Sequence, residues 1–499
     1  MVVDILKLCI DKGFLLDKTV LRLLNKLEEK KAIEIVKILT NLGLDERVVT
    51  KDLFDLHIDK FRDMLVKEGN GEAVDDRKSV KLLSASVFSS RKIEVSHFIE
   101  YFSSRYKILK GILELKNFNN LSSIRRIGSN SGIYTIIGMV FSKRITKNKN
   151  LLIEVEDLTG SSVILVNKEN RVLFEKCSNL LLDDVVAFCV SGSSDMLFAK
   201  DVIYPDCELG KEKRGRVDEY VAFSGDFHVG SKMFLESNFL KFVSWLNGEM
   251  GDDRSRAIAR KVKYLFLSGD IIDGVGIYQE QEKFLNIKTC KGQYQKVAEM
   301  LGKIRGDVEI VMCPGQHDAV WIGEPQPTIP KKWASDLWRM ENLYLVPNPA
   351  LVEIDSNFKI LMYHGASINR FIDEISEIRM RFGHSHPTKV VREMLKRRHL
   401  APTHGIMDYI PCEGKDSLVI DVVPDIVVTG DQHRAEVGSY NNILMVAGSC
   451  WQSTTPFEEK IGNVSEPCRV PLFNLKTREI KMIDFSDDEV GDFKEVGDA

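Results

Sequence analysis

The stretch VEIVMCPGQHDAV (residues 308–320) decides the fold. Its first half is apolar and has the composition of a buried β-strand, which a Pro-Gly turn then breaks. Gln316, His317 and Asp318 follow the turn at once. An ordinary loop does not need three such side chains directly after a core strand. We therefore expect them to serve a site at the end of that strand.

Four other segments have the same shape, an apolar run followed by a turn with acidic or histidine residues. They are YVAFSGDFHVGS with Asp226 and His228, KYLFLSGDIIDG with Asp270 and Asp273, FKILMYHGAS with His364, and DIVVTGDQHR with Asp431 and His433. The carboxyl ends of parallel strands meet at one edge of a sheet, so these side chains can converge. Imidazole and carboxylate groups together suit divalent manganese, iron or zinc. Two such ions about 3.5–4 Å apart can hold a phosphate and activate a water molecule.

The chain is expected to be an α/β multidomain protein. Residues 1–68 show helical periodicity and predict a small helical domain, and the polar segment 69–95 reads as a linker. A helical lead-in and several short β-rich runs over 96–210 predict an OB-like β-barrel. Alternating apolar strands and helices over 215–486 predict the domain that carries the site. The acidic tail 487–499 is expected to be disordered.

The predicted barrel carries a basic turn with Lys143, Arg144, Lys147 and Lys149. Such a turn can contact the phosphates of a single nucleic-acid strand. The alternatives are a solvated hairpin tip and a barrel that binds another protein. Composition does not decide among them, because the net charge of the 499 residues is −4.

Composition places the chain in a reducing, intracellular setting, and we expect it to be cytoplasmic. The nine cysteines include no CxxC pair. The start MVVDILKLCIDKG has charges within its apolar run, which argues against a signal peptide. No window approaches the roughly 20 uninterrupted apolar residues of a membrane span.

The order of the strand-end motifs resembles the calcineurin-like metallophosphoesterase superfamily. The surrounding segments DFHVGSKMFLESNFLKFVSWLNG, GDIIDGVGIYQEQ, PGQHDAVWIGEPQP, LKRRHLAPTHG and WQSTTPF resemble the small subunit of archaeal family D DNA polymerase. This resemblance implies a phosphoesterase β-sandwich flanked by helices. It also implies a 3′-to-5′ exonuclease that degrades single-stranded or mismatched primer ends, with a large catalytic polymerase subunit and DNA as partners.

The resemblance also implies roles for individual residues. One metal ion would be held by Asp226, His228 and His433, with Asp270 as a bridge, and the second by His364, Gln316 and Asp431. His317 would be the catalytic histidine. Asp273 and Asp318 would orient histidines from behind the ligands. Manganese is the ion we expect, and iron, zinc and magnesium are compatible with the same ligands.

Two positions depart from the family pattern. Gln316 stands where the family has Asn, and Asp431 where it has the first His of Gly-His-x-His. Both changes fall on the second metal. They are compatible with a site adapted to manganese or magnesium, or with a weak or inactive site in a subunit that acts as a scaffold. A free-standing phosphatase or cyclic-nucleotide phosphodiesterase is a third hypothesis, against which the polymerase-like segments argue.

A literal Gly-His-Ser-His occurs elsewhere, in RFGHSHPTK. It follows a helical pattern rather than a strand, so we expect His384 and His386 to be loop residues. Farther along, Arg397 and Arg398 in MLKRRHLAPTHG can contact the DNA backbone, or can instead bridge to neighbouring carboxylates.

Overall fold

The computed structural model divides the chain into two compact units, residues 1–78 and 79–499, which we take separately. In the first unit it describes residues 9, 12, 15–16, 20–21, 24, 29–41 and 48–49. In the second it describes residues 79–85, 93–354, 357–405, 408–412, 414–455, 464–487 and 494–495. Among these residues, no helix combines the length and the apolar character that crossing a membrane requires.

The described part of the first unit contains one helix and two very short strands with defined bounds, and Cys9, Val20, Leu21 and Leu24 are also helical. In α3 (Glu29–Asn41), the buried residues Ala32, Ile35, Val36 and Leu39 recur at helical spacing and form one apolar face. Strand β1 (Leu15–Leu16) pairs in parallel with β2 (Val48–Val49). The other positions of the helical domain predicted over 1–68 lie outside the described residues.

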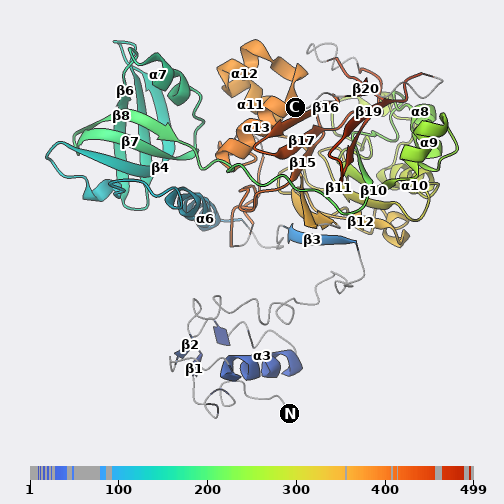
Figure 1. Cartoon of the computed structure of the whole chain (residues 1–499), viewed down its shortest axis with the longest axis horizontal. Coiled ribbons are helices and arrows are strands. Elements are labelled where there is room, and N and C mark those ends of the chain that lie inside the picture. Colours follow the sequence, from blue (N-terminus) through green and yellow to red (C-terminus); the bar gives the residue numbers. More distant parts are fainter. Residues whose placement is uncertain are drawn as a thin grey trace. The chain divides into compact units, whose positions relative to one another are not determined.

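The larger unit is built around two facing sheets (Figure 1). The first sheet has the order β12-β11-β10-β9-β18-β19-β20 and the second the order β16-β17-β15-β14-β13-β3. The strands of the first are β9 (Tyr220–Ser224), β10 (Val262–Ser268), β11 (Glu309–Cys313), β12 (Leu343–Leu345), β18 (Arg469–Asn474), β19 (Ile480–Asp484) and β20 (Lys494–Glu495). Those of the second are β3 (Val80–Ala85), β13 (Ala350–Ile354), β14 (Phe358–Met362), β15 (Ile426–Thr429), β16 (Glu436–Tyr440) and β17 (Ile443–Ala447).

Helices cover the outer face of each sheet. The first sheet is covered by α8 (Glu236–Leu246), α9 (Asp253–Ala259) and α10 (Cys290–Leu301), and the second by α11 (Ile368–Glu374), α12 (Ser376–Arg381) and α13 (Pro387–Arg397). Along β10, Phe266 points between the sheets, while Leu265 and Leu267 pack under the helices. A strand that is buried on both faces reads as a continuous apolar run, which is how these strands were recognisable in the sequence.

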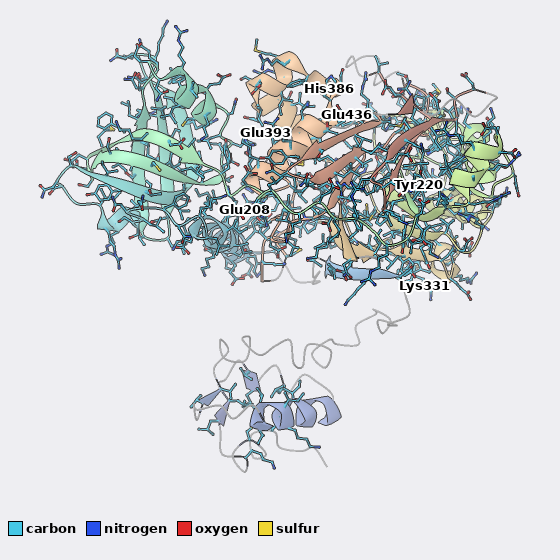
Figure 2. All side chains as sticks on the ribbon, viewed as in Figure 1. Glu208, Tyr220, Lys331, His386, Glu393 and Glu436 are labelled. Carbon is cyan, nitrogen blue, oxygen red and sulfur yellow. The ribbon has the colours of Figure 1, made fainter. Side chains whose placement is uncertain are left out.

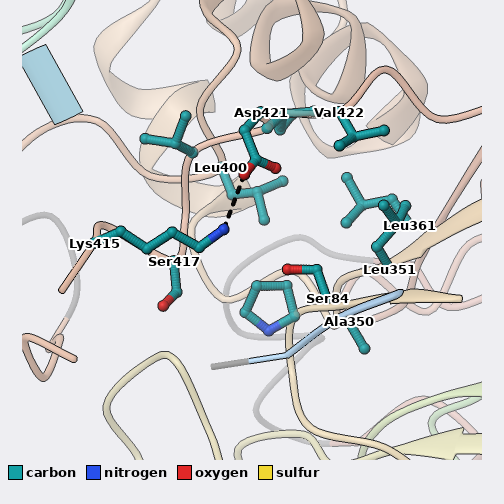
Figure 3. A pocket seen from close by; sticks show the side chains of 12 residues that line it. Ser84, Ala350, Leu351, Leu361, Leu400, Lys415, Ser417, Asp421 and Val422 are labelled. Atoms are coloured by element: carbon teal, nitrogen blue, oxygen red, sulfur yellow. Dashed lines mark hydrogen bonds and ion pairs between the residues drawn. The ribbon is translucent and has the colours of Figure 1, made fainter. Parts of the chain in front are cut away.

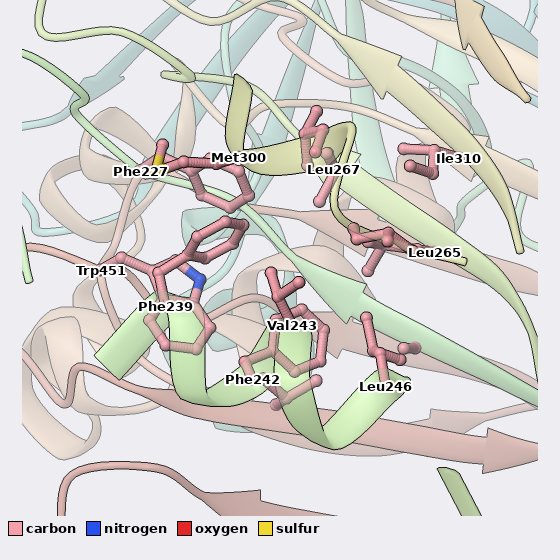
Figure 4. Packing of buried hydrophobic residues seen from close by; sticks show 14 of the residues in the cluster. Phe227, Phe239, Phe242, Val243, Leu246, Leu265, Leu267, Met300, Ile310 and Trp451 are labelled. Carbon is pink, nitrogen blue, oxygen red and sulfur yellow. The ribbon is translucent and has the colours of Figure 1, made fainter. Parts of the chain in front are cut away.

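An aromatic cluster anchors α8 to the first sheet (Figure 4). Phe242 stacks on Trp451, with ring centroids 5.5 Å apart, and Phe239 meets the same indole edge-on. The indole Nε1–H of Trp451 donates to Ser224 Oγ at the end of β9. The packing of this layer is therefore tied to a strand end that leads into the site.

In the chain, the barrel comes after β3 and before all the other strands of these two sheets. Strands β4 (Gly132–Ile145), β5 (Leu151–Asp157), β6 (Gly160–Val166), β7 (Val185–Ser193) and β8 (Met196–Ile203) close in the order β4-β5-β6-β8-β7. The helix α7 (Arg171–Ser178) lies between the third and fourth strands, and α6 (Val95–Glu114) packs on β4 and β7. The predicted α/β fold with a β-barrel and a two-sheet domain is confirmed, although the barrel follows the first strand of that domain.

The segment 69–95, which we predicted to be a linker, supplies β3 to the second sheet. This strand pairs antiparallel with β13, from Val80 opposite Ile354 to Ala85 opposite Ala350. Ser84 of β3 lines a small pocket with Leu351, Leu400 and an ion pair between Lys415 and Asp421, 2.9 Å apart (Figure 3). The acidic tail contributes β20, and its residues 488–493 and 496–499 lie outside the described residues.

Candidate metal centre

The predicted ligands come together at the strand ends. Strands β9, β10 and β11 are parallel neighbours in the first sheet, and β14 and β15 are parallel neighbours in the second. Among the residues that the structure describes, three groups of side chains offer ligand atoms within 4.8 Å of one another. They are Asp226, His228 and His433; Asp226, Asp270 and His364; and His228, Asp273 and His317.

The backbone is unusual at five of the predicted ligand positions. Asp226, His228, Asp270, Asp431 and His433 have φ angles of 48°, 51°, 47°, 67° and 55°. This left-handed region is costly for residues other than glycine, although Asp and His tolerate it better than most. Strained residues of this kind gather at functional sites, where the surrounding fold holds them in place.

Gly315 lets the turn after β11 pass close to the ligands. A Cβ on Gly315 would collide with the carboxylate of Asp270 and would lie 2.8 Å from the His364 ring. The Pro-Gly turn therefore has a steric reason: any side chain at the second position would occupy the ligand cluster.

His364 has the geometry of a histidine that ligates a metal. It is fully buried, and its Nδ1–H donates to the carbonyl oxygen of Ser268 at 2.7 Å. Its Nε2 atom is therefore the ring nitrogen left for a metal ion or a second proton, and it faces Asp270 Oδ1 at 3.4 Å without a hydrogen bond. Two electron-rich atoms this close are stable only with a proton or a cation between them.

A second pair of facing ligand atoms joins the turn after β9 to the turn after β15. His228 Nε2 lies 3.1 Å from His433 Nε2, while His228 Nδ1 faces Asp273 Oδ1 at 3.4 Å. Asp270 Oδ2 lies 3.9 Å from His228 Nε2, so the Asp270 carboxylate faces one histidine of each cluster. This donor set fits two divalent ions, with Asp270 and Asp226 both placed to be shared.

Burial and neighbouring charges act on the carboxylates in opposite directions. Burial raises the pKa of Asp226 to about 7, against the lowering influence of His433. Burial also acts on Asp270, but His364 and His317 outweigh it and hold the pKa of Asp270 well below its usual range. Several buried carboxylates in one cluster are costly unless positive charge is shared among them, which a divalent cation would provide.

His317 stands at the more accessible side of the cluster. Its backbone N–H donates to Asp270 Oδ1 at 2.8 Å, and its Nδ1–H donates to the carbonyl oxygen of Asp273 at 2.9 Å. Its Nε2 atom lies 4.0 Å from Asp270 Oδ2. The ring is therefore fixed in orientation, with Nε2 directed into the cluster.

The two positions that depart from the family pattern differ in their surroundings. Asp431 Oδ1 lies 3.9 Å from His364 Nε2, and Asp431 Oδ2 accepts hydrogen bonds from Gln432 and Asn369. Its backbone N–H donates to Asp226 Oδ1 at 3.1 Å. Gln316 is half-buried in the turn that begins at Gly315.

The role predicted for Asp318 needs correction. Its carboxylate accepts hydrogen bonds from the backbone N–H groups of Gly315 and Ile271 and from the hydroxyl of Tyr294. It therefore holds the turns after β10 and β11 together rather than orienting a histidine. Asp273, by contrast, faces His228 directly.

His384 and His386 lie in the short turn Gly383–Ser385 and just after it, as predicted for loop residues. Figure 2 shows His386 and Glu436 near each other, and His386 Nδ1 lies 2.9 Å from the Glu436 carboxylate. His384 Nδ1 lies 3.3 Å from Gln432 Oε1. Neither histidine is in a candidate ligand group among the described residues.

The DNA contacts predicted for Arg397 and Arg398 are wrong, and the alternative of internal bridging holds. The side chain of Arg397 is 1% exposed and pairs with Asp184 of the barrel at 3.2 Å and with Glu393. Arg398 donates to the carbonyl oxygens of Ile420 and Asp421. Buried guanidinium groups that are already satisfied by the protein cannot reach a phosphate.

The residues of the predicted basic turn in the barrel also differ in whether they bond within the protein or face solvent. Lys143 donates to the carbonyl oxygens of Ser178 and Leu180, and burial lowers its pKa. It serves the barrel itself, and its predicted DNA contact is not supported. Arg144, Lys147 and Lys149 are exposed, so a phosphate contact by these three residues remains a prediction.

A buried polar network that the sequence analysis missed supports the cluster. Asn348 Oδ1 accepts the backbone N–H of His364, and Asn348 Nδ2 donates to Glu324 and Gln326. Gln326 in turn donates to the carbonyl oxygen of Gly315. The network connects the strand ends of both sheets. Its one signal in the sequence was the polar pair in GEPQP.

Comparisons with known proteins match this architecture. A family model for the B subunit of DNA polymerases alpha and epsilon matches residues 223–437. The DNA polymerase II small subunit of Methanothermobacter thermautotrophicus is 38% identical, over 79% of this chain and 80% of its own length. The protein of the same name from Archaeoglobus fulgidus is 36% identical, over 77% and 76%.

Solved structures give weaker matches. Vacuolar protein sorting 29 from Cryptosporidium parvum is 16% identical with a TM-score of 0.28, over 56% of this chain and 99% of its own. A novel archaeal phosphodiesterase is 13% identical with a TM-score of 0.26, over 53% and 98%.

The curated relatives confirm the resemblance to the small subunit of archaeal family D DNA polymerase. Their identity exceeds 30% over most of both chains, and it extends beyond the segments that first suggested the family. The chain therefore belongs to the family of archaeal DNA polymerase II small subunits.

Proposed function

We propose that this chain is a metal-dependent 3′-to-5′ exonuclease that removes nucleotides from single-stranded or mismatched primer ends. It would act as the proofreading subunit beside a large catalytic polymerase subunit, as the name of its relatives suggests. The observation that carries the proposal is the convergence of Asp226, Asp270 and the histidines at the ends of strands from both sheets.

Two divalent ions, manganese by expectation, would be held by Asp226, His228, His433, Asp270, His364 and Asp431, with Gln316 as a further oxygen donor. Bound there, they would supply positive charge for the phosphate and an activated water molecule. The residues of the chain hold this arrangement ready, because Ser268 fixes His364 and Asp273 faces His228.

His317 is proposed as the catalytic residue. With Nδ1–H donated to the Asp273 carbonyl, protonation leaves Nε2–H directed into the cluster. From there it can donate a hydrogen bond to the phosphate or a proton to the departing 3′ oxygen. The contact between its backbone N–H and Asp270 couples its position to that of the metal ligands.

A second candidate function is a scaffold subunit with weak or no nuclease activity. The replacements at Gln316 and Asp431 favour it, because both fall on one metal. The hydrogen bonds that Asn369 and Gln432 donate to Asp431 Oδ2 also leave only Oδ1 of this carboxylate facing His364.

Degradation of a 5′-labelled single-stranded oligonucleotide with manganese separates the two candidates. We expect a ladder that shortens from the 3′ end, its loss with EDTA, and a fall of at least about 100-fold for His317→Ala. Equal activity in this variant and the wild type would identify a contaminating nuclease. No cleavage by a folded protein that binds manganese would favour the scaffold.

A further inference from the structure

Two loops that continue from the cluster residues Asp273 and His317 expose apolar side chains. The loop after β10 carries Val275 and Tyr278, and the loop after β11 carries Trp321 and Ile322. Their exposed fractions are 43%, 47%, 38% and 58%. We call these four residues the aromatic rim.

The loop after β11 holds Trp321 close to the ligand turn. The side-chain Nε2 of Gln326 donates to the carbonyl oxygens of both Gly315 and Trp321, at 3.1 Å each. The indole Nε1–H of Trp321 donates to the carbonyl of Pro325, which fixes the ring. These hydrogen bonds hold the loop that follows His317 in a compact conformation. The Trp321 indole has a fixed orientation and is partly exposed.

The loop after β10 is pinned in a similar way. Gln281 donates to the carbonyl and the carboxylate of Asp273, and its Oε1 accepts the backbone N–H of Ile277. A Cβ on Gly274 would lie 2.5 Å from the carbonyl oxygen of His317. Tyr278 therefore belongs to a loop that packs directly against the catalytic candidate.

We propose that the aromatic rim binds the unstacked bases of a single DNA strand whose phosphate lies at the metal centre. This inference rests on the proposed function. A phosphodiester carries its bases within one nucleotide of the reacting phosphorus. Bases next to the cluster therefore need an apolar surface, and the rim provides one beside His317. Base stacking on aromatic rings is insensitive to sequence and requires an unpaired strand, which suits a frayed primer end.

Binding without metal tests the rim independently of cleavage. The full-length chain in EDTA is titrated with a fluorescent single-stranded oligonucleotide, and with a copy that is abasic at its last three 3′ positions. We expect Trp321→Ala to weaken binding of the normal strand by about 5- to 100-fold, since stacking contributes about 1–3 kcal/mol per base. Trp321→Phe should keep most of the affinity.

The abasic strand supplies the decisive comparison. It should bind the wild type as weakly as the normal strand binds Trp321→Ala, and combining the two changes should add little. Trp338→Ala is the matched control, because that indole is 42% exposed and belongs to the separate helical turn Leu337–Arg339, farther along the chain than Trp321. Tyr278→Ala should behave like Trp321→Ala.

Three outcomes would overturn the inference. Trp321→Ala could bind the normal strand as tightly as the wild type does. Removal of the bases could weaken the wild type and Trp321→Ala by the same factor. Trp321→Ala could also lose co-purification with the large subunit while keeping its DNA affinity, which would make the rim a protein interface. Failure to cleave DNA, with base-dependent binding intact, would contradict the proposed function alone.

Discussion

At the scale of single residues, the candidate centre depends on backbone shape as much as on its ligands. Five ligand candidates adopt left-handed φ angles, and Gly315 leaves the space that Asp270 and His364 occupy. The positions of the donors are therefore set before any ion arrives, and small steric changes beside them should affect metal binding directly.

Gly315→Ala tests this dependence. The new methyl group would overlap the Asp270 carboxylate, so we expect a loss of about 1–3 kcal/mol in the free energy of unfolding and a manganese affinity at least about tenfold weaker. Titration calorimetry with manganese and urea unfolding measure the two effects. Gly306→Ala is the control, since nothing lies within 4 Å of a Cβ there. Equal manganese affinity in both variants would contradict the steric argument.

The sequence was sufficient to predict that histidine and aspartate side chains meet at the strand ends, because each directly follows an apolar strand. It was not sufficient for Arg397, Arg398 and Lys143. A basic side chain in a loop looks the same whether it meets water or a buried acceptor. For Arg397 the acceptor lies in the barrel, more than two hundred positions away in the sequence.

At the scale of elements, α13 joins the barrel to the second sheet. Near its first residue, Thr388 donates two hydrogen bonds to Glu436 of β16. Near its end, Arg397 contacts Asp184 and the carbonyl of Asn179, and its guanidinium lies 5.1 Å from the centre of the Tyr204 ring. One helix thus connects the barrel to the strand beside the Asp431–His433 turn.

Arg397→Met should destabilise this joint. Removing the guanidinium leaves the buried carboxylate of Asp184 without its counter-charge, a change that costs about 3–5 kcal/mol in comparable buried pairs. Chemical denaturation measures the loss, and adding Asp184→Asn should recover part of it. A variant as stable as the wild type but weaker in DNA binding would instead restore the phosphate contact that the sequence suggested.

Elements were predictable where periodicity was strong. The barrel strands and the strands before the ligands follow from their apolar runs and turn residues. Strand β3 did not, because VKLLSA is short and follows a polar segment. Its partner β13 comes only after the barrel and four strands of the first sheet, so no local pattern marks the pairing.

At the scale of the whole larger unit, a buried charge cluster should set part of the acid sensitivity. Asp416 pairs with Arg105 of α6 at 2.6 Å and accepts a hydrogen bond from His399 Nε2 at 2.9 Å. His399 Nδ1 accepts the backbone N–H of Ala401, so the ring is neutral in the folded protein. Burial, reinforced by Arg105, lowers the pKa of His399 to about 4.

Stability should therefore fall as the pH drops from about 6.5 towards about 4. The unfolded chain takes up a proton at His399 near its usual pKa of 6.5, whereas the folded protein resists it, so protonation favours unfolding. We expect this residue to account for up to about 3 kcal/mol at the acid end of that range. Urea unfolding of the metal-free protein at several pH values, compared with His399→Gln, measures it. A variant with an unchanged pH slope would exclude His399 as the cause.

The position of β3 in the chain affects how the second sheet can form during folding. The sheet that presents His364 and His433 takes one edge strand from a segment ahead of the barrel and the remainder from residues beyond it. The barrel is thus an insertion within the two-sheet domain that carries the candidate metal centre, and does not simply precede that domain. During synthesis, β3 leaves the ribosome long before β13, so it cannot form this pairing until β13 has been made. A gene fragment that begins at the barrel would lack a structural piece of the very domain it was meant to isolate.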